Sequence, residues 1–472
     1  MTGSPATVVE QVLAAASGSA TVVAVETAHE ANLRWALSMA TTNGLASSCT
    51  VTITAIADVV GAPGSTTSGK SIATRSGPVD DWPHVLAEAE AAAAAAAAAG
   101  QTAGEESELP TGARSADFDL PAAGPTMLPE LPALADAFAD GGGGGSSEGP
   151  LEFFGYAEQS VLTEHIGTSA GARWRAVERS ARFEVSAKSQ GRRRSAWSGA
   201  AADLLTDIDV PRAIAEVREG LRLQAECVDV PAAPRTVILT PSAVADLMIV
   251  FWWAAVARDA AEGRSPFSGP GAAPTMLGEA LSPRPLTLRS DPQAAGIQAT
   301  DRLWTPTSGA AATVFDTGAP IDAVDWVAEG KLAALMTTRA GAADLDLPFA
   351  PSAANLALHD ADGWGSLADV VARTDDALLI TSLWYIRDVD PQAMLVTGLT
   401  RDGTYLVRDG RVVGGAGNFR FNDSPMALLG RIVDAGDPVR CLPREWADYF
   451  SRTSMPPLVV GDFGLSTPSA AI

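Results

Sequence analysis

The most constraining feature of this 472-residue sequence is one long apolar helix pattern near its middle. The segment Arg235–Thr240 (RTVILT) is typical of a buried strand, and a proline then opens a helical pattern that runs to about Ala260. Within that pattern the run Leu247–Ala257 (LMIVFWWAAVA) is too short to cross a bilayer. The sequence therefore predicts a core or interface helix at this point.

The rest of the chain divides into three parts by composition and pattern. Residues 1–100 combine strand patterns with an alanine-rich helix at 81–99, which predicts an N-terminal α/β region. Residues 101–150 are rich in Pro, Gly, Glu and Ser, so we expect a flexible insertion or linker with a short helix at 131–138. Residues 151–472 carry mostly strand patterns and a tight-turn signal at Asp409-Gly410, which predicts a β-rich domain with mostly antiparallel strands. The predicted fold class is α+β.

The clearest alternation in the N-terminal part lies in residues 31–40 (ANLRWALSMA). Leu33, Trp35, Leu37 and Met39 occupy every second position, and the residues between them are mostly polar. A period of two predicts a half-buried strand with these four side chains on the buried face.

The charge balance excludes several classes of partner. The formal net charge is −23 and the sequence pI is about 4.5, so direct binding to nucleic acid or to an acidic membrane surface is disfavoured.

The three cysteines, Cys49, Cys227 and Cys441, are far apart and show no metal-ligand spacing. Their spacing argues for a reducing compartment, and we expect a cytoplasmic protein with no disulfide framework.

One short motif fits a phosphate-binding loop. Residues 64–71 (GSTTSGKS) match a glycine, four residues and then Gly-Lys-Ser. Such a loop requires a helix to start at about Lys70-Ser71, whereas the following SIATRSGP has a strand pattern and reaches Gly77-Pro78 within one helical turn or two. We therefore interpret residues 64–71 as a polar loop that joins two antiparallel strands.

Other signals of catalytic chemistry are weak. The four histidines, His29, His84, His165 and His359, are too far apart in sequence for one helix to present two of them to a metal. The basic cluster Arg192–Arg194 is interpreted as a solvated loop, with an anchor for a carboxylate or for a partner's acidic face as the alternative.

Several blocks of this sequence together resemble the TldD/PmbA family, historically called modulators of DNA gyrase. They are ETAHEANLRWALSMATTNG at 26–44, RSAWSG at 194–199, TVILTPSAVADLM at 236–248, GRSPFSG at 263–269 and GLTRDGTYLVRDGRVVGGAGNFRFNDSP at 398–425. The resemblance covers nearly the whole chain apart from the linker, and the last block is the most specific.

The resemblance implies a protease made of two related subunits. One type, TldD, carries a metal-binding HExxxH motif on a helix that follows a strand-to-proline turn, and the other, TldE/PmbA, lacks it. The matching helix here, residues 241–263, contains no histidine. The chain is thus expected to be a TldE/PmbA-type subunit with no metal of its own, whose partner is an HExxxH-bearing TldD-type paralogue and whose substrate is an unfolded or extended peptide. The alternatives are a stand-alone peptide-binding or regulatory protein, and an independent enzyme for which the sequence offers no support.

The resemblance also suggests substrate or interface residues. They are Arg34, Trp197, Asn418, Arg420, Asn422 and Ser424. In residues 418–422 alternation places the two phenylalanines on one face and the polar residues on the other. This pattern fits a strand with one core face and one hydrogen-bonded face, and the functional alternative points Arg420 toward a peptide carboxylate or the subunit boundary.

Overall fold

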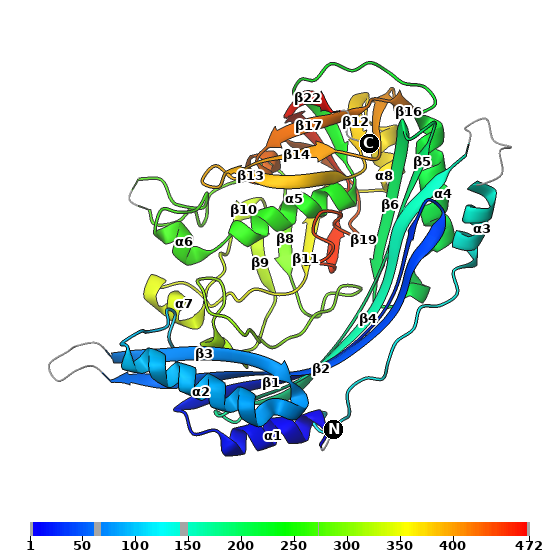
Figure 1. Ribbon diagram of the computed structural model, residues 1–472. Coiled ribbons are helices and arrows are strands. Elements are labelled where there is room, and N and C mark those ends of the chain that lie inside the picture. Colours follow the sequence, from blue (N-terminus) through cyan, green and yellow to red (C-terminus); the bar gives the residue numbers. More distant parts are fainter. Residues whose placement is uncertain (1–2, 61–67, 142–149, 272, 470–472) are drawn as a thin grey trace.

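A long, curved, antiparallel sheet runs along one side of the molecule (Figure 1). The structure is a computed structural model that describes residues 3–60, 68–141, 150–271 and 273–469. The strands of this sheet lie in the order β3-β2-β1-β4-β5-β6. They are β1 (Ala20–Ala36), β2 (Met39–Val60), β3 (Ser68–Pro78), β4 (Glu152–Thr168), β5 (Arg173–Ser189) and β6 (Arg194–Ala202).

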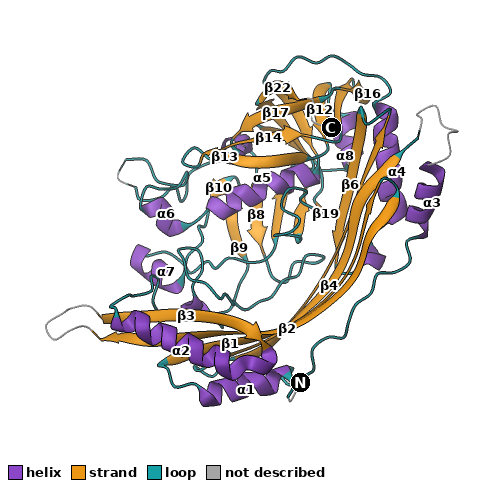
Figure 2. Cartoon of the chain, in the orientation of Figure 1, coloured by secondary structure: helices purple, strands orange, loops and turns teal. Residues whose placement is uncertain are grey.

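Helices cover one face of this sheet at both of its ends (Figure 2). At one end α1 (Pro5–Ala15) and α2 (Trp82–Ala98) enclose an aliphatic cluster that includes Val23 and Ile53. At the other end α3 (Pro132–Gly141) and α4 (Val210–Leu223) pack over Trp35 and Phe183. The odd-numbered residues of β1, β4 and β5 point to this face, because side chains alternate along a strand.

The strand predicted at 31–40 ends earlier than expected. β1 stops at Ala36, and Leu37 and Ser38 both have positive φ, at 54° and 59°, so they form a tight primed turn into β2. Trp35 is buried as predicted, but Leu37 and Met39 are 46% and 64% exposed. The alternation was correct up to Trp35, and the reversal of the chain then placed the last two apolar residues in solvent.

The phosphate-loop motif does not lead into a helix. Residues 61–67 lie outside the described residues, and Ser68–Ser71 already belong to β3, which pairs antiparallel with β2 up to Pro78. Lys70 Nζ lies 2.6 Å from Glu108, and Ser71 Oγ donates to the carbonyl of Ala93 at 2.8 Å. The expected antiparallel pair is confirmed, but residues 68–71 are strand and not loop.

The expected linker is anchored to the protein over much of its described length. Glu105 accepts hydrogen bonds from Arg258 and Thr338, and Phe118 is fully buried beneath the sheet helices. The short helix expected at 131–138 is present as α3. The first sheet also takes strands from both sides of residues 101–150, since β1 pairs with β4 along most of its length.

The C-terminal part forms three smaller sheets around one helix. Their strand orders are β10-β9-β8-β11-β20-β19, β16-β15-β12-β7-β21-β18 and β13-β14-β17-β22, and only the β7–β12 and β11–β20 pairs are parallel. The α+β class with mostly antiparallel C-terminal strands is therefore confirmed. The predicted turn at Asp409-Gly410 joins β15 to β16, with positive φ at both residues.

The strands of these sheets are β7 (Arg235–Leu239), β8 (Leu286–Ser290), β9 (Val324–Ala328), β10 (Lys331–Leu332), β11 (Leu356–Asp360), β12 (Asp376–Ile380), β13 (Leu383–Asp390), β14 (Leu395–Thr400), β15 (Thr404–Arg408), β16 (Arg411–Gly415), β17 (Asn418–Asp423), β18 (Ile432–Ala435), β19 (Val439–Cys441), β20 (Thr453–Met455), β21 (Leu458–Phe463) and β22 (Leu465–Ser469). The helices are α5 (Pro241–Ala254), α6 (Ala257–Ala261), α7 (Arg339–Leu345), α8 (Leu367–Ala372) and α9 (Pro425–Leu429), with 3-10 turns at Val79–Asp81, Leu205–Asp207 and Val314–Asp316.

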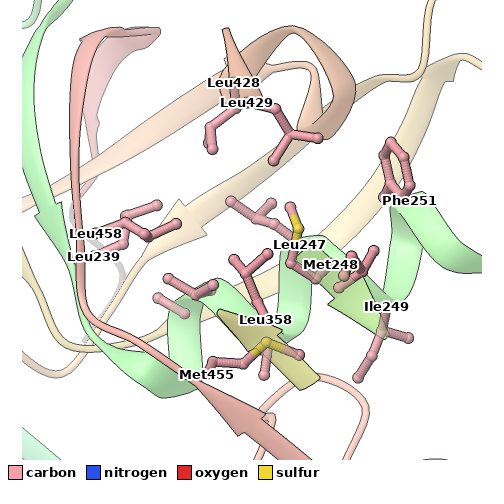
Figure 3. Packing of buried hydrophobic residues seen from close by; sticks show 14 of the residues in the cluster. Leu239, Leu247, Met248, Ile249, Phe251, Leu358, Leu428, Leu429, Met455 and Leu458 are labelled. Carbon is pink, nitrogen blue, oxygen red and sulfur yellow. The ribbon is translucent and has the colours of Figure 1, made fainter. Parts of the chain in front are cut away.

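Helix α5 lies at the centre of the largest core, as the apolar run predicted. Figure 3 shows Leu247, Met248 and Phe251 of this helix facing side chains from several strands and from α9. Thr240 caps the helix by accepting from the backbone N–H of Ala243. Among the described residues, no helix is both long enough and apolar enough to span a membrane.

Candidate functional site

The side of the long sheet opposite the helices faces the C-terminal part and carries many polar side chains, although at one end Val22, Ile166 and Trp174 belong to apolar clusters that pack with Trp304. We call it the polar face, and it carries the even-numbered residues of β1, β4 and β5. Hydrogen bonds join it to the C-terminal part, because Arg182 contacts Asp448 at 2.6 Å and Ser180 contacts Ser451 at 3.3 Å. In the middle of the sheet its side chains are only partly covered. Partly covered polar side chains on a rigid sheet are suited to binding a ligand.

Arg34, one of the predicted site residues, lies on this polar face. Its guanidinium lies over the ring of Tyr156, 5.2 Å from the centroid, and Arg182 approaches the same ring at 4.8 Å. The Tyr156 hydroxyl donates to Glu158 at 2.5 Å. Burial, together with Glu158, raises the pKa of Tyr156, so the phenol remains protonated and acts as a donor.

Trp197, a second predicted site residue, lies at the junction between β6 and the C-terminal part. Its indole Nε1 donates to Glu184 at 3.3 Å, and the guanidinium of Arg444 lies 4.9 Å from its ring centroid. Arg444 also approaches the ring of Trp384 at 5.3 Å and pairs with the buried carboxylate of Asp402. The cation is thus held between two indole rings, which fixes the position of the β6 end.

An acidic group that sequence reasoning missed occupies the middle of the polar face. Glu164 on β4 lies directly opposite Glu26 on β1, and Glu178 on β5 is a diagonal neighbour. Burial raises the pKa of Glu164 to about 8, with repulsion from Glu26 and Glu178 adding to the effect and a hydrogen bond to Trp304 opposing it. Burial also raises the pKa of Glu26. Finding this group required the strand register, because the three residues come from separate strands.

The predicted residues at 418–424 lie in a different sheet from Arg34 and Trp197. Phe419 and Phe421 are buried, whereas Arg420 and Asn422 are exposed, so the expected alternation is present. Arg420 Nη1 donates to Thr397 Oγ1 at 3.3 Å. These are the contacts of a strand with one core face, and the structure does not bring them together with the polar face.

The two ends of this strand have distinct surroundings. Asn418 lines a small cavity together with Arg193 and Arg194. Ser424 is the N-cap of α9, where its Oγ accepts from Ala427 N at 3.4 Å. Ser424 therefore has a structural role, because its hydroxyl caps α9.

The α5 region contains a buried acid that the sequence did not reveal. Asp246 is fully buried, Oδ1 accepts from the backbone N–H of Glu445 at 3.0 Å, and Oδ2 has no hydrogen-bond partner. Burial raises the pKa of Asp246 well above its usual value. Cys441 lies close to the start of α5, with Sγ 3.5 Å from the carbonyl of Pro241, and burial raises the pKa of its thiol to about 12.

The histidines are separate from one another in space as well as in sequence. His165 is buried, with Nε2 2.9 Å from the carbonyl of Leu120, whereas His29 contacts Ser47 at 2.8 Å and His84 contacts Glu88 at 3.3 Å. Within the ranges that the structure describes, no three His, Cys, Asp or Glu side chains are arranged to hold a metal ion.

Comparison with known proteins identifies relatives of this fold. Residues 233–467 match the model of the PmbA/TldA metallopeptidase C-terminal domain. No curated protein matches the sequence significantly. Among solved structures, TldE from Thermococcus kodakarensis is similar, with a TM-score of 0.74 and 15% identity over 95% of this chain and 97% of that one.

Two further structures share the architecture. One, a proposed modulator of DNA gyrase from Thermotoga maritima, has a TM-score of 0.70 and 14% identity over 95% of this chain and 96% of that one. The other, from Bacteroides thetaiotaomicron and described in the same terms, has a TM-score of 0.70 and 11% identity over 98% of each chain. At these identities the likeness shows the fold alone.

Proposed function

We propose that this chain, which belongs to the PmbA/TldD metallopeptidase family, is the subunit without a catalytic metal in a TldD/TldE-type protease complex. The character of α5 carries the proposal. Metal-bearing subunits of the family hold HExxxH on the helix that follows a strand-to-proline turn, and α5 begins in the same way at Pro241 but has no histidine. Its side chains instead fill the core, where Phe251 packs on Phe267 and Trp252 packs on Trp326.

The donors near α5 do not fit a metal. Among the described residues they include the buried carboxyl of Asp246 and the buried thiol of Cys441. The nearby carboxylate of Glu445 is already held by Arg387 and by the backbone N–H groups of Tyr385 and Ile386. A metal binds the thiolate, and a thiol with a pKa of about 12 stays protonated at neutral pH. We therefore assign hydrolysis to the partner subunit.

The polar face supports a part in substrate binding. It presents the guanidinium groups of Arg34 and Arg182 and, beside Glu26, the protonated carboxyl of Glu164, on a sheet whose backbone is fixed by neighbours on both sides. An extended peptide offers amide groups and polar side chains, which such a surface can hold by hydrogen bonds. The proposed contribution of this chain is shape and substrate contact.

An unprotected strand edge supports a subunit partner. β3 pairs with β2 only from Thr50 onward, so among the described residues the segment 39–49 of β2 has a paired strand on one side only. No acidic or basic residue occurs from Met39 to Ala57, and Leu45 is 70% exposed. Soluble proteins usually protect such an edge with charges or with a covering segment, so we place the TldD-type paralogue here.

Co-purification and reconstitution test the proposal. The tagged chain is expected to recover an HExxxH-bearing paralogue from native extract of its source cells. The purified chain alone is expected to leave an unfolded polypeptide intact, while the reconstituted pair degrades it and loses this activity on treatment with a chelator.

Two outcomes would contradict the proposal. Chelator-resistant cleavage by the chain alone would reveal a catalytic group of its own. Peptide binding by the chain with no paralogue recovered would favour the stand-alone binding or regulatory protein. We also propose a cytoplasmic location, which the three unpaired cysteines support and which fractionation of the same cells tests.

A further inference from the structure

A small cavity lies where the β5–β6 turn, the end of α4 and the strands β15–β17 meet. Its volume is about 90 Å³, and its lining includes Arg193, Arg194, Cys227 and Asn418. We propose that this cavity binds a small oxyanion, either a terminal carboxylate or a phosphate.

The two arginines bring positive charge to the cavity. Arg193 Nε donates to the carbonyl of Gln190 at 3.1 Å, and Arg194 Nη2 donates to the carbonyl of Ala225 at 3.3 Å. Neither forms an ion pair with a carboxylate in the described part of the chain, whereas the adjacent Arg192 contacts Glu152 at 2.7 Å. Asp402, which accepts from the lining residue Ser195, is itself paired with Arg401 and Arg444. In a protein of net charge −23, two arginines without a carboxylate partner among the described residues favour an anion from outside.

The walls of the cavity leave room for an anion to approach closely. Gly403, Gly415 and Gly417 contribute bare backbone to the lining. A Cβ at Gly403 would meet Thr381 at 2.4 Å and one at Gly415 would meet Gln224 at 3.0 Å, so the open space lies at Gly417, where nothing is within 4 Å. One water takes about 30 Å³ in the liquid, so the cavity accommodates a carboxylate or a phosphate group. A guanidinium offers paired N–H donors that match the two oxygens of either group.

Cys227 provides a reporter inside the cavity. Its side chain is exposed, Cys49 is partly buried and Cys441 is buried. A neutral alkylating reagent should therefore modify Cys227 fastest, and an anion in the cavity should cover this thiol. Peptide mass spectrometry follows each cysteine separately, so Cys49 serves as the internal reference. The site requires no partner subunit, and the experiment uses the full chain alone.

Phosphate is the first probe, titrated against chloride at constant ionic strength. We expect saturable protection of Cys227 with a Kd of about 1 mM, as a few charge-assisted hydrogen bonds would give, and no change at Cys49. The Arg193→Gln/Arg194→Gln double variant should weaken phosphate at least about tenfold. The matched control Arg75→Gln, in which an exposed arginine donates to the carbonyl of Thr74, should bind as the parent does.

A conservative variant and a second probe complete the test. Arg193→Lys/Arg194→Lys keeps the charge, so it should retain part of the affinity, and its melting temperature shows whether the turn still folds.

Short peptides with free or amidated C-termini then separate the two sources of oxyanion. Protection by the free carboxylate identifies a peptide terminus, and protection by phosphate alone identifies free phosphate. Equal alkylation of Cys227 at every anion concentration, or protection that survives in the double Gln variant, would overturn the proposal.

Discussion

Replacing Glu164 by Gln should stabilise the protein in a strongly pH-dependent way. The unfolded carboxyl titrates near 4.5 and the folded one near 8, so below pH 4.5 both states are protonated and the substitution has little effect. As the pH rises toward 8, the unfolded state gains stability by ionising while the folded state does not. The stability of the parent therefore falls across this window, and the variant is spared that loss.

The structure sets the size of this effect. Each pH unit between the two pKa values is worth about 1.4 kcal/mol, which gives about 4 kcal/mol at pH 7.5 as an upper limit. Because Glu164 is only partly covered and its neighbours can rearrange, we expect about half of this, or about 2 kcal/mol. With an unfolding entropy of about 2.1 cal/mol/K per residue, a whole-chain transition of 472 residues would shift by about 2 °C.

Differential scanning calorimetry at constant ionic strength measures the effect. The difference in melting temperature between Glu164→Gln and the parent should be near zero at pH 4.5, grow with pH and level off above about pH 8. Glu279→Gln, in an exposed loop, is the matched control and should show no such trend. A difference that stays the same at every pH would refute the reasoning, because it would mean that the carboxyl of Glu164 has the same pKa in the folded and unfolded states.

Three further predictions concern separate features. Ser424→Ala should lower stability by about 1 kcal/mol through loss of the α9 cap yet leave recovery of the paralogue unchanged; loss of that recovery in a stable variant would assign Ser424 to the interface. Leu45→Lys should abolish recovery of the paralogue without changing the melting temperature of the isolated chain, and unchanged recovery would exclude the β2 edge as the contact. Lys70→Ala should remove one partly exposed ion pair with Glu108, at a cost of at most about 1 kcal/mol; ATP affinity that disappears with this substitution would restore the phosphate-loop reading.

The sequence predicted those elements whose signal is local. The apolar run at 247–257 indicated the buried helix, and the alternation at 418–422 correctly separated Phe419 and Phe421 from Arg420 and Asn422. The turn at Leu37-Ser38 was missed because neither residue type favours positive φ, so the pattern read as one strand.

The polar face could not be predicted because it depends on register between distant strands. Glu26, Glu164 and Glu178 come together only when β1, β4 and β5 are aligned side by side. The burial of Asp246 likewise depends on Glu445, which lies 199 residues away in sequence. Such long-range pairs leave no periodic signal within a window of neighbouring residues.

The pairing of β1 with β4 affects the order in which this chain can fold. Val22 pairs with Thr168 and Trp35 with Gly155, so one side of β1 has no backbone partner until β4 has been synthesised. During translation the strands of the first hundred residues can pair with one another before β4 exists. Until then the free edge of β1 exposes unpaired backbone groups to other chains. Closing a loop of more than a hundred residues to complete the sheet makes this a slow, non-local step. A fragment that ends within residues 101–150 would therefore expose the β1 edge permanently, and aggregation of such fragments would be the cellular consequence.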